Sequence, residues 1–408
     1  MKNPSILISG AGIAGPALAY WLHRYGFHPT VVERTPTLRS GGHVVDIRGT
    51  ARRVAELTGI VPEVRKAHTG ARGMAFVDRT GKRIANLSTD VFGDSGGPVA
   101  EMAIPRSDLA RILYEATRDD VEYVFGDSIT AAEEDGDGVR VAFENGEPRN
   151  FDLLVGADGV HSNVRRLVFG PEERYVRDLG GYVALFTTTT AVDLAGSQLM
   201  YTMPGGNGRP GKTAGLYPQH TPGTALAGFM FRSDLRYDER DIDEQKRIVL
   251  RTFEGEEWEI PRMLSQIWDA PDFYFDRVVQ VQADTWSHRR TVLLGDAGYC
   301  ASPMSGIGTS LALVGAYILA GELMEADGDH RCAYTAYERE MREFVDRAHA
   351  FARRQGNDGL APESLARLWL RNQSVRMLPY LPKRLVSRGM DTLSNTVELK
   401  DYAALTHG

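Results

Sequence analysis

The sequence predicts an α/β fold: a doubly wound parallel sheet that carries an inserted, mostly antiparallel β-sheet domain. An apolar run at Ile6–Ile8, a glycine turn, a helical stretch and a second apolar run at Thr30–Val32 form the pattern of a βαβ unit. Apolar runs at 151–155 and 291–294 also end in glycine and aspartate. Between them, residues 181–285 are rich in β-branched and aromatic residues separated by Gly- and Pro-containing turns, which is typical of antiparallel strands.

Composition excludes several classes of protein. The chain has 408 residues, 42% of them hydrophobic, and a net charge of −7, so it offers no electrostatic case for binding nucleic acid. Only Cys300 and Cys332 occur, which predicts no disulfide framework and favours a reducing cytoplasm. No His or Cys cluster has metal-ligand spacing. The apolar stretch 311–321 is too short to cross a bilayer, so we expect no membrane insertion.

The first motif is Gly10-Ala11-Gly12-Ile13-Ala14-Gly15, which follows a strand and opens a helix. Its glycines allow a tight turn, close approach of a pyrophosphate and close helix–strand packing, and the helix N-terminus favours the negative charge of phosphates. Glu33 ends the second strand, eighteen residues after Gly15. A carboxylate there accepts hydrogen bonds from both ribose hydroxyls and repels a 2′-phosphate. The tightly held nucleotide is therefore predicted to be FAD or NAD, not NADP.

Two further motifs place an aspartate where a buried strand meets glycine. One is Gly156 to Ser162, which contains Asp158 and is followed by Arg165. The other is Gly295-Asp296, followed by the turn Pro303 to Gly308. Carboxylates at these positions can accept hydrogen bonds from sugar-like hydroxyls, and a helix N-terminus after the turn would stabilise a reduced flavin. Each motif by itself is equally compatible with a plain Asp-Gly turn.

In this order the motifs resemble those of the group A flavin monooxygenases, the p-hydroxybenzoate hydroxylase family, over residues 1 to about 350. Residues 39–48 resemble the flavin-lining loop of its tetracycline-inactivating branch. Two positions depart from the family pattern, because Tyr299 replaces a common histidine and Ile307 replaces a glutamine. The resemblance implies FAD contacts at Gly10, Gly12, Ile13, Ala14, Gly15, Glu33, Arg34, Arg39, Asp46, Arg106, Asp158, Gly295, Asp296, Pro303, Gly306, Ile307 and Gly308.

The resemblance also implies how the chain is divided. A glutathione-reductase-like doubly wound FAD domain would comprise residues 1–70, 100–180 and 276–350. A substrate-binding β-sheet domain would comprise 71–99 and 181–275, and residues 351–408 would form a C-terminal helical segment. In that segment we expect a helix that packs across both domains with its basic charges in water.

The implied activity is hydroxylation of an electron-rich aromatic or polyketide-type small molecule, including oxidative inactivation of a drug. NADPH or NADH would reduce FAD transiently, and O₂ would react through a flavin hydroperoxide. The cofactor performs this chemistry, so no catalytic triad is expected, and His43 is the one residue singled out as a possible catalytic group. The predicted substrate contacts are Pro303, Met304 and Gly306, together with Phe229, Met230 and Phe231 on one strand, where alternation lets only one face serve.

Other functions remain open at this stage. The stretch Trp258-Glu259-Ile260-Pro261 half-matches a halogenase signature, although a packing role is favoured. Alkene reduction on the same scaffold and a non-redox FAD protein are further alternatives. Cys300 is expected to be a small buried filler. The sequence leaves open the substrate, the choice of NADH or NADPH, and whether the protein is a monomer or a homodimer.

Overall fold

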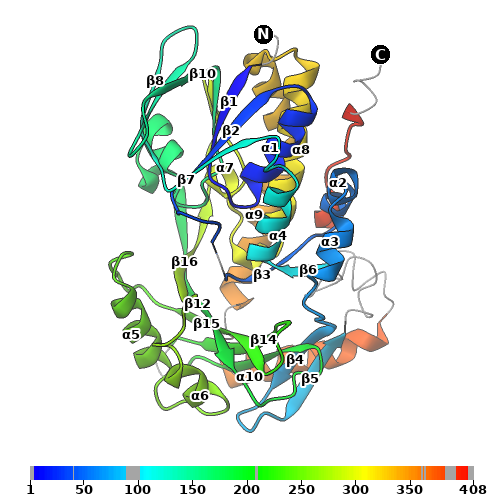
Figure 1. Ribbon diagram of the computed structural model, residues 1–408. Helices are drawn as coiled ribbons and strands as arrows, with labels where there is room; N and C mark the ends of the chain where they lie inside the picture. Colours follow the sequence, from blue (N-terminus) through cyan, green and yellow to red (C-terminus); the bar gives the residue numbers. More distant parts are fainter. Residues whose placement is uncertain are drawn as a thin grey trace.

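The computed structural model describes residues 4–39, 41–88, 102–206, 210–359, 362, 364–381 and 392–402. Its two main sheets lie one above the other, as Figure 1 shows, with a nucleotide-binding type of sheet in the upper part and a larger sheet in the lower part. The model confirms the predicted mixed α/β class. Three basic residues expected in the C-terminal helical segment, Lys383, Arg384 and Arg388, lie outside the described residues.

The upper sheet has six strands in the order β17-β18-β11-β1-β2-β7. All neighbouring pairs are parallel except β17–β18. The aliphatic residues of its central strands are buried, because helices cover both faces of such a sheet. The strands are β1 (Ser5–Ser9), β2 (His28–Glu33), β7 (Glu122–Phe125), β11 (Leu153–Gly156), β17 (Ser287–His288) and β18 (Thr291–Leu293).

Helix α8 (Gly308–Glu325) is buried around almost its whole circumference, because it packs against α1 (Ala14–Arg24), α2 (Thr50–Thr58) and α9 (His330–Gly359). Further helices are α3 (Val61–Lys66), α4 (Arg106–Glu115) and α7 (Asp296–Tyr299). Two small sheets flank this part: β8 (Ile129–Glu134), β9 (Val139–Phe143) and β10 (Arg149–Phe151), and the pair β3 (Val44–Asp46) and β6 (Ala103–Pro105).

The lower sheet has seven strands in the order β16-β12-β15-β14-β13-β4-β5. Its pairs are antiparallel except β4–β13. Strands β12 and β16 extend past the boundaries expected at 181 and 275, because they run continuously from the upper part into this sheet. The strands are β4 (Gly73–Val77), β5 (Arg83–Ser88), β12 (Val176–Thr189), β13 (Ser197–Met203), β14 (Lys212–Pro218), β15 (Thr224–Arg232) and β16 (Tyr274–Val281).

The two faces of the lower sheet differ. One face is an aromatic core covered by α5 (Ile242–Phe253) and α6 (Ile260–Ser265). The other face has a smaller apolar cluster of Val183, Leu185 and Leu226, with Tyr217 and Met230 packed against it. At the β5 edge, α10 (Leu365–Met377) packs through Val375 against Ala85 and Leu87. We refer to the face that carries Leu185 and Leu226 as the inner face.

Candidate cofactor and substrate site

The first glycine motif forms a turn in which Gly10 and Gly15 tolerate no side chain. Gly10 has φ +108°, and a Cβ there would lie 2.6 Å from the carbonyl oxygen of Ala157. A Cβ at Gly15 would lie 1.9 Å from the carbonyl oxygen of Gly10. At Gly12 the nearest atom to such a Cβ is Nη2 of Arg106, at 3.4 Å, so the space next to this glycine is bordered by a cation. Helix α1 begins after Ile13 without a side-chain cap, so its first N–H groups fit a pyrophosphate.

The three motifs meet in space at the ends of β1, β11 and β18. A Cβ at Gly10 would be 2.9 Å from the Cα of Asp158, which places the second motif against the first. Gly295 has φ +65°, and a Cβ there would be 3.2 Å from the Cβ of Ala14, which places the third motif against the start of α1. This convergence is the arrangement that binding of one extended dinucleotide requires.

Glu33 is held at the end of β2 by backbone groups. One carboxylate oxygen accepts a hydrogen bond of 2.9 Å from the backbone N–H of Ala11, and the other accepts from the N–H and hydroxyl of Thr35, at 3.0 and 2.9 Å. The side chain is half-buried and Arg34 beside it is exposed. A carboxylate fixed in this way keeps free lone pairs for ribose hydroxyls.

The carboxylate of Asp158 is hydrogen-bonded mainly to groups of the protein itself. It accepts hydrogen bonds from the backbone N–H groups of Asn163 (2.9 Å) and Val164 (3.1 Å) and from the hydroxyls of Ser162 and Ser9. Burial raises the pKa of Asp158, while these donors act in the opposite direction. The carboxylate thus shapes the second motif, and a contact of this side chain with FAD stays a prediction.

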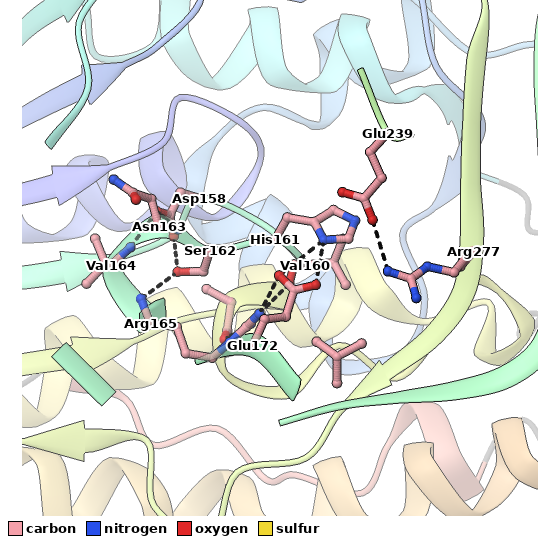
Figure 2. Close-up of polar contacts among 12 residues, drawn as sticks. Asp158, Val160, His161, Ser162, Asn163, Val164, Arg165, Glu172, Glu239 and Arg277 are labelled. Atoms are coloured by element: carbon pink, nitrogen blue, oxygen red, sulfur yellow. Dashed lines mark hydrogen bonds and ion pairs between the residues drawn. The ribbon is translucent and has the colours of Figure 1, made fainter. Parts of the chain in front are cut away.

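Arg165 joins the second motif to the third. Its side chain is fully buried and donates hydrogen bonds to the carbonyl oxygens of Ala297 (2.8 Å) and Val160 (2.7 Å). It also pairs with Glu172, at 3.5 Å, and Figure 2 shows the two side chains pointing toward each other beside the second motif. A buried cation with carbonyl and carboxylate partners fixes the spacing between the two motifs.

His161 lies in the same cluster, between two carboxylates (Figure 2). Its Nδ1 is 3.0 Å from Glu172 and its Nε2 is 3.4 Å from Asp276, a residue of β16. Hydrogen bonding to Asp276 and then to Glu172 raises the pKa of His161 to about 10, although partial burial opposes the shift. The imidazolium therefore ties the turn after β11 to the lower sheet at neutral pH.

Asp296 stands where the third motif faces Arg106. The side chain is exposed, and burial of its surroundings raises its pKa while the charge of Arg106 lowers it. One carboxylate oxygen is 3.9 Å from where a Cβ of Gly308 would stand, at the first residue of α8. Helix α8 has no side-chain cap, so its N-terminal N–H groups are available to an anionic group beside Asp296.

The loop before β3 borders the same space. Arg106 donates its backbone N–H to the carbonyl oxygen of His43, at 3.0 Å. Burial and the charge of Arg106 lower the pKa of His43 to about 4, so the imidazole is neutral at neutral pH. Arg39 is exposed, and its pKa is lowered by burial of its surroundings and by the neighbouring Arg34. Asp46 accepts a hydrogen bond of 2.5 Å from Arg48. A catalytic role for His43 stays a prediction.

The turn after α7 exposes part of the third motif. Pro303 and Gly306 are exposed and Met304 is half-buried, whereas the side chain of Ile307 is fully buried in the core. The residue before the turn, Ser302, has φ +83°, and its hydroxyl accepts a hydrogen bond of 3.3 Å from the N–H of Met304. The exposed side of the turn is therefore backbone, proline and methionine.

Tyr299 and Cys300, just before this turn, have structural roles. The hydroxyl of Tyr299 is 2.8 Å from that of Tyr337, inside the helix packing. Burial and the nearby Asp296 raise the pKa of the Cys300 thiol well above its usual value, so the thiol stays protonated and weakly nucleophilic.

Trp258 of the half-matched halogenase pattern packs edge-on against Tyr201, with ring centroids 6.0 Å apart.

The structure separates the three predicted contacts on β15. Phe229 and Phe231 are buried in the aromatic core under α5, where both rings stack edge-on against Phe253. Met230 is half-buried on the inner face, with Leu226. Strand alternation sets these opposite directions.

The inner face is the one that meets the loop before β3. Asp272 accepts a hydrogen bond of 2.6 Å from the hydroxyl of Thr187, two residues along β12 from Leu185. Gly41 lies against the same carboxylate, because a Cβ at Gly41 would be 2.7 Å from the Cβ of Asp272. The inner face and the loop that contains His43 thus border one space.

Tyr217 on β14 is a residue that the sequence analysis missed. A Cβ at Gly228 would lie 2.6 Å from its ring, so this glycine lets the ring lie on the inner face. Its hydroxyl has no hydrogen-bond partner among the described residues, and burial raises its pKa to about 12. The signal in the sequence that could have indicated this role of Tyr217 is the presence of Gly215 and Gly228, which lie opposite each other on β14 and β15.

Searches of the described residues complete the site. They contain no group of three or more His, Cys, Asp or Glu side chains arranged to hold a metal ion. They also contain no helix with the length and hydropathy needed to span a membrane.

Comparisons with known proteins agree with this geometry. Residues 4–352 match the family model described as FAD binding domain. The chain is 40% identical over 351 residues to a flavin-dependent monooxygenase of Legionella longbeachae (86% of this chain, 88% of the relative). It is 44% identical over 346 residues to an uncharacterised protein of Mycobacterium tuberculosis (84% and 91%).

Among solved structures, the chain is similar to the tetracycline destructase Tet(55), with a TM-score of 0.83 and 35% identity over 98% of this chain and 100% of that chain. Together with the converging glycine motifs, these findings show that the chain belongs to the FAD binding domain family and is an FAD-dependent monooxygenase of the p-hydroxybenzoate hydroxylase type.

Proposed function

We propose that this enzyme uses NADPH or NADH and O₂ to hydroxylate an electron-rich aromatic or polyketide-type small molecule. The observation that carries the proposal is the inner face of the lower sheet, which meets the loop that contains His43. It presents apolar side chains and a phenol with no hydrogen-bond partner among the described residues. The 35% identity to a tetracycline destructase over nearly the whole chain supports a polycyclic substrate, including a drug that is inactivated by oxidation.

The residues suited to hold FAD are divided among the three motifs. Gly10, Gly12 and the first N–H groups of α1 would hold the pyrophosphate, and the Glu33 carboxylate would accept hydrogen bonds from the ribose hydroxyls. Asp296 would hold the ribityl chain, and the N–H groups at the start of α8 would donate to the flavin pyrimidine edge. The bound cofactor would supply the redox chemistry that links nicotinamide oxidation to insertion of one oxygen atom from O₂.

On the substrate side, side chains of this protein orient the substrate and shield it from water. Leu185, Leu226 and Met230 exclude water from one side of the space, and Met304 and Pro303 border it near the third motif. With its pKa raised to about 12, Tyr217 remains a hydrogen-bond donor at neutral pH, so it suits a carbonyl or phenolate oxygen of the substrate.

The nicotinamide is proposed to bind transiently. One dinucleotide fingerprint is present, at Gly10–Gly15, and Glu33 already completes it as an FAD site. A second Rossmann unit for NADPH would need its own fingerprint, so the reductant is expected to dock at the open side of the same site.

The test is a turnover assay with a substrate panel. Purified yellow enzyme is mixed with NADPH or NADH in air, with phenols, anthraquinones or tetracyclines added singly. The expected result is nicotinamide oxidation and O₂ uptake that rise with one class of compound, together with a product heavier by one oxygen atom in mass spectrometry.

Three outcomes would replace the proposal. Halide-dependent products indicate halogenation, and consumption of NADPH without O₂ uptake indicates reduction of an alkene. A bound flavin that neither nicotinamide reduces, with every panel compound present, indicates a non-redox FAD protein. Tyr217→Phe serves as the matched variant, because it keeps the ring on Gly228 and removes only the hydroxyl; we expect a higher KM with unchanged flavin content.

A further inference from the structure

Exposed large apolar side chains are concentrated in one segment. The described residues include ten of them, and six lie between 365 and 381. Three of these, Leu365, Trp369 and Leu370, are 74%, 63% and 60% exposed on α10, and Met377 ends the same helix at 57%. Tyr380 and Leu381 follow directly. Contiguous exposed apolar surface of this kind marks a binding face.

The exposed residues form one face of α10, because Leu365, Trp369, Leu370 and Met377 fall within an arc of about 140° at 100° per residue. The opposite face is anchored. Val375 is buried against β5, and the guanidinium of Arg371 lies 4.2 Å from the ring centroid of Phe76. Arg376 lies within the exposed arc, and its Nε reaches the protein by donating a hydrogen bond of 2.5 Å to the carbonyl oxygen of Ile84. The helix is thus fixed on the protein with a second apolar face turned outward.

The charge around this face indicates what covers it. Helix α10 has three basic residues, Arg367, Arg371 and Arg376, and no acidic residue, in a chain whose net charge is −7. A tryptophan and a tyrosine beside leucines, with arginines alongside, are the side chains that favour the interface of an anionic bilayer.

We propose that α10 is a peripheral membrane-binding face, which lays Trp369 and Leu370 into the surface of a bilayer that contains anionic lipid. With thirteen residues, the helix lies on the membrane and does not cross it. The proposal goes beyond the hydroxylation reaction, because it concerns the exposed side of α10, whose other side packs on Phe76 and Leu87.

The test uses sedimentation of the flavin-loaded enzyme with large vesicles. Vesicles of phosphatidylglycerol and phosphatidylcholine are compared with vesicles of phosphatidylcholine alone. We expect binding to the first kind only, and loss of that binding at about 1 M salt, where the screening length falls to about 3 Å. The double variant Trp369→Gln, Leu370→Gln should bind at least about tenfold more weakly, since two apolar side chains leave the interface.

The matched control is Leu235→Gln with Trp268→Gln, which changes the same residue types at exposed positions outside α10. It should bind the vesicles like the wild type, and both double variants should keep their bound flavin and their nicotinamide oxidation rate. Absence of wild-type binding to phosphatidylglycerol vesicles, or equal loss in the control variant, overturns the proposal. The molecular mass in solution without lipid is also measured. If the wild type is a dimer and the α10 variant is a monomer, the face binds a second copy of the chain and the proposal is overturned.

Discussion

The guanidinium of Arg165 donates a hydrogen bond of 2.8 Å to the carbonyl oxygen of Ala297, a residue 132 positions away in the chain. The donor follows the second glycine motif and the acceptor follows Asp296 of the third. One buried side chain therefore sets the distance between two motifs that must hold the same cofactor.

Arg165→Met should lower both stability and cofactor affinity. The substitution removes the donors to Ala297 and Val160 and leaves their carbonyl groups buried and unpaired, which we expect to cost about 2–4 kcal/mol in the free energy of unfolding. Urea unfolding and flavin titration measure the two effects. Arg166→Met is the control, because that side chain is exposed and, among the described residues, hydrogen-bonds to Asn163 alone. Equal stability of the two variants would contradict the assigned role.

Glu33→Ala should weaken FAD binding by about 1–3 kcal/mol, since charge-assisted hydrogen bonds to the ribose are lost. Glu33 also accepts from Ala11 and Thr35, so the variant can lose some stability as well. Thr35→Val removes the hydroxyl contacts with Glu33 and Thr37, keeps the backbone N–H, and is the control for that structural part. Fluorescence titration of apoprotein with FAD gives the dissociation constant. A lower melting temperature with an unchanged dissociation constant would mean that Glu33 only holds the turn.

Asp296→Ala should lower the fraction of enzyme that retains FAD through dialysis. The carboxylate faces the start of α8, and its removal deletes a hydrogen-bond acceptor worth about 1–2 kcal/mol. Asp296→Asn keeps one acceptor oxygen and should lie between the wild type and the alanine variant. The ratio of absorbance at the flavin and protein bands measures occupancy. The exposed Asp119→Ala is the control. If Asp296→Ala retains as much FAD as this control, Asp296 does not bind the cofactor.

His161 predicts a specific pH dependence of stability. Its pKa is raised to about 10, so its contribution is fully present below the unfolded value of about 6.5 and is lost as pH rises through 10. Because the side chain is partly exposed to solvent, which screens its ion pairs, we expect a contribution of about 1–2 kcal/mol.

The measurement compares urea unfolding of the wild type and His161→Gln at pH 6 and near pH 10. The stability difference between the two proteins should shrink as the pH rises. The exposed His288→Gln should show a difference that does not change with pH in this way. A constant gap for His161→Gln would show that the imidazole is not charged in the folded protein.

Neighbouring residues on β15 should respond differently to truncation. Phe229→Ala leaves a cavity in the aromatic core and should cost about 3–5 kcal/mol in stability. Met230→Ala should leave stability nearly unchanged and raise the KM for the substrate by about tenfold, since it removes a wall of the inner face. Steady-state kinetics with a saturating nicotinamide separates the two effects. A KM change in both variants would mean that the inner face is not the substrate side.

The sequence determined the class of fold and the location of the three motifs, because both depend on local patterns. Gly10 to Gly15 with Glu33 specifies a strand, a turn and a helix within one short stretch, and buried parallel strands appear as uninterrupted aliphatic runs. Helices α2 and α3 and strand β8 were not predicted, because their short segments mix polar and apolar residues and take their order from packing against the rest of the chain.

Only the tertiary structure decided how distant residues share the site. Alternation along β15 showed that Phe229 and Met230 point in opposite directions, but the position of α5 decides which direction is the core. Arg165 meets Ala297, and Tyr217 lies on Gly228, through contacts between strands and turns that no local pattern encodes. Such long-range contacts follow from which faces the whole chain can bury at once, and so they become visible only when the chain is folded.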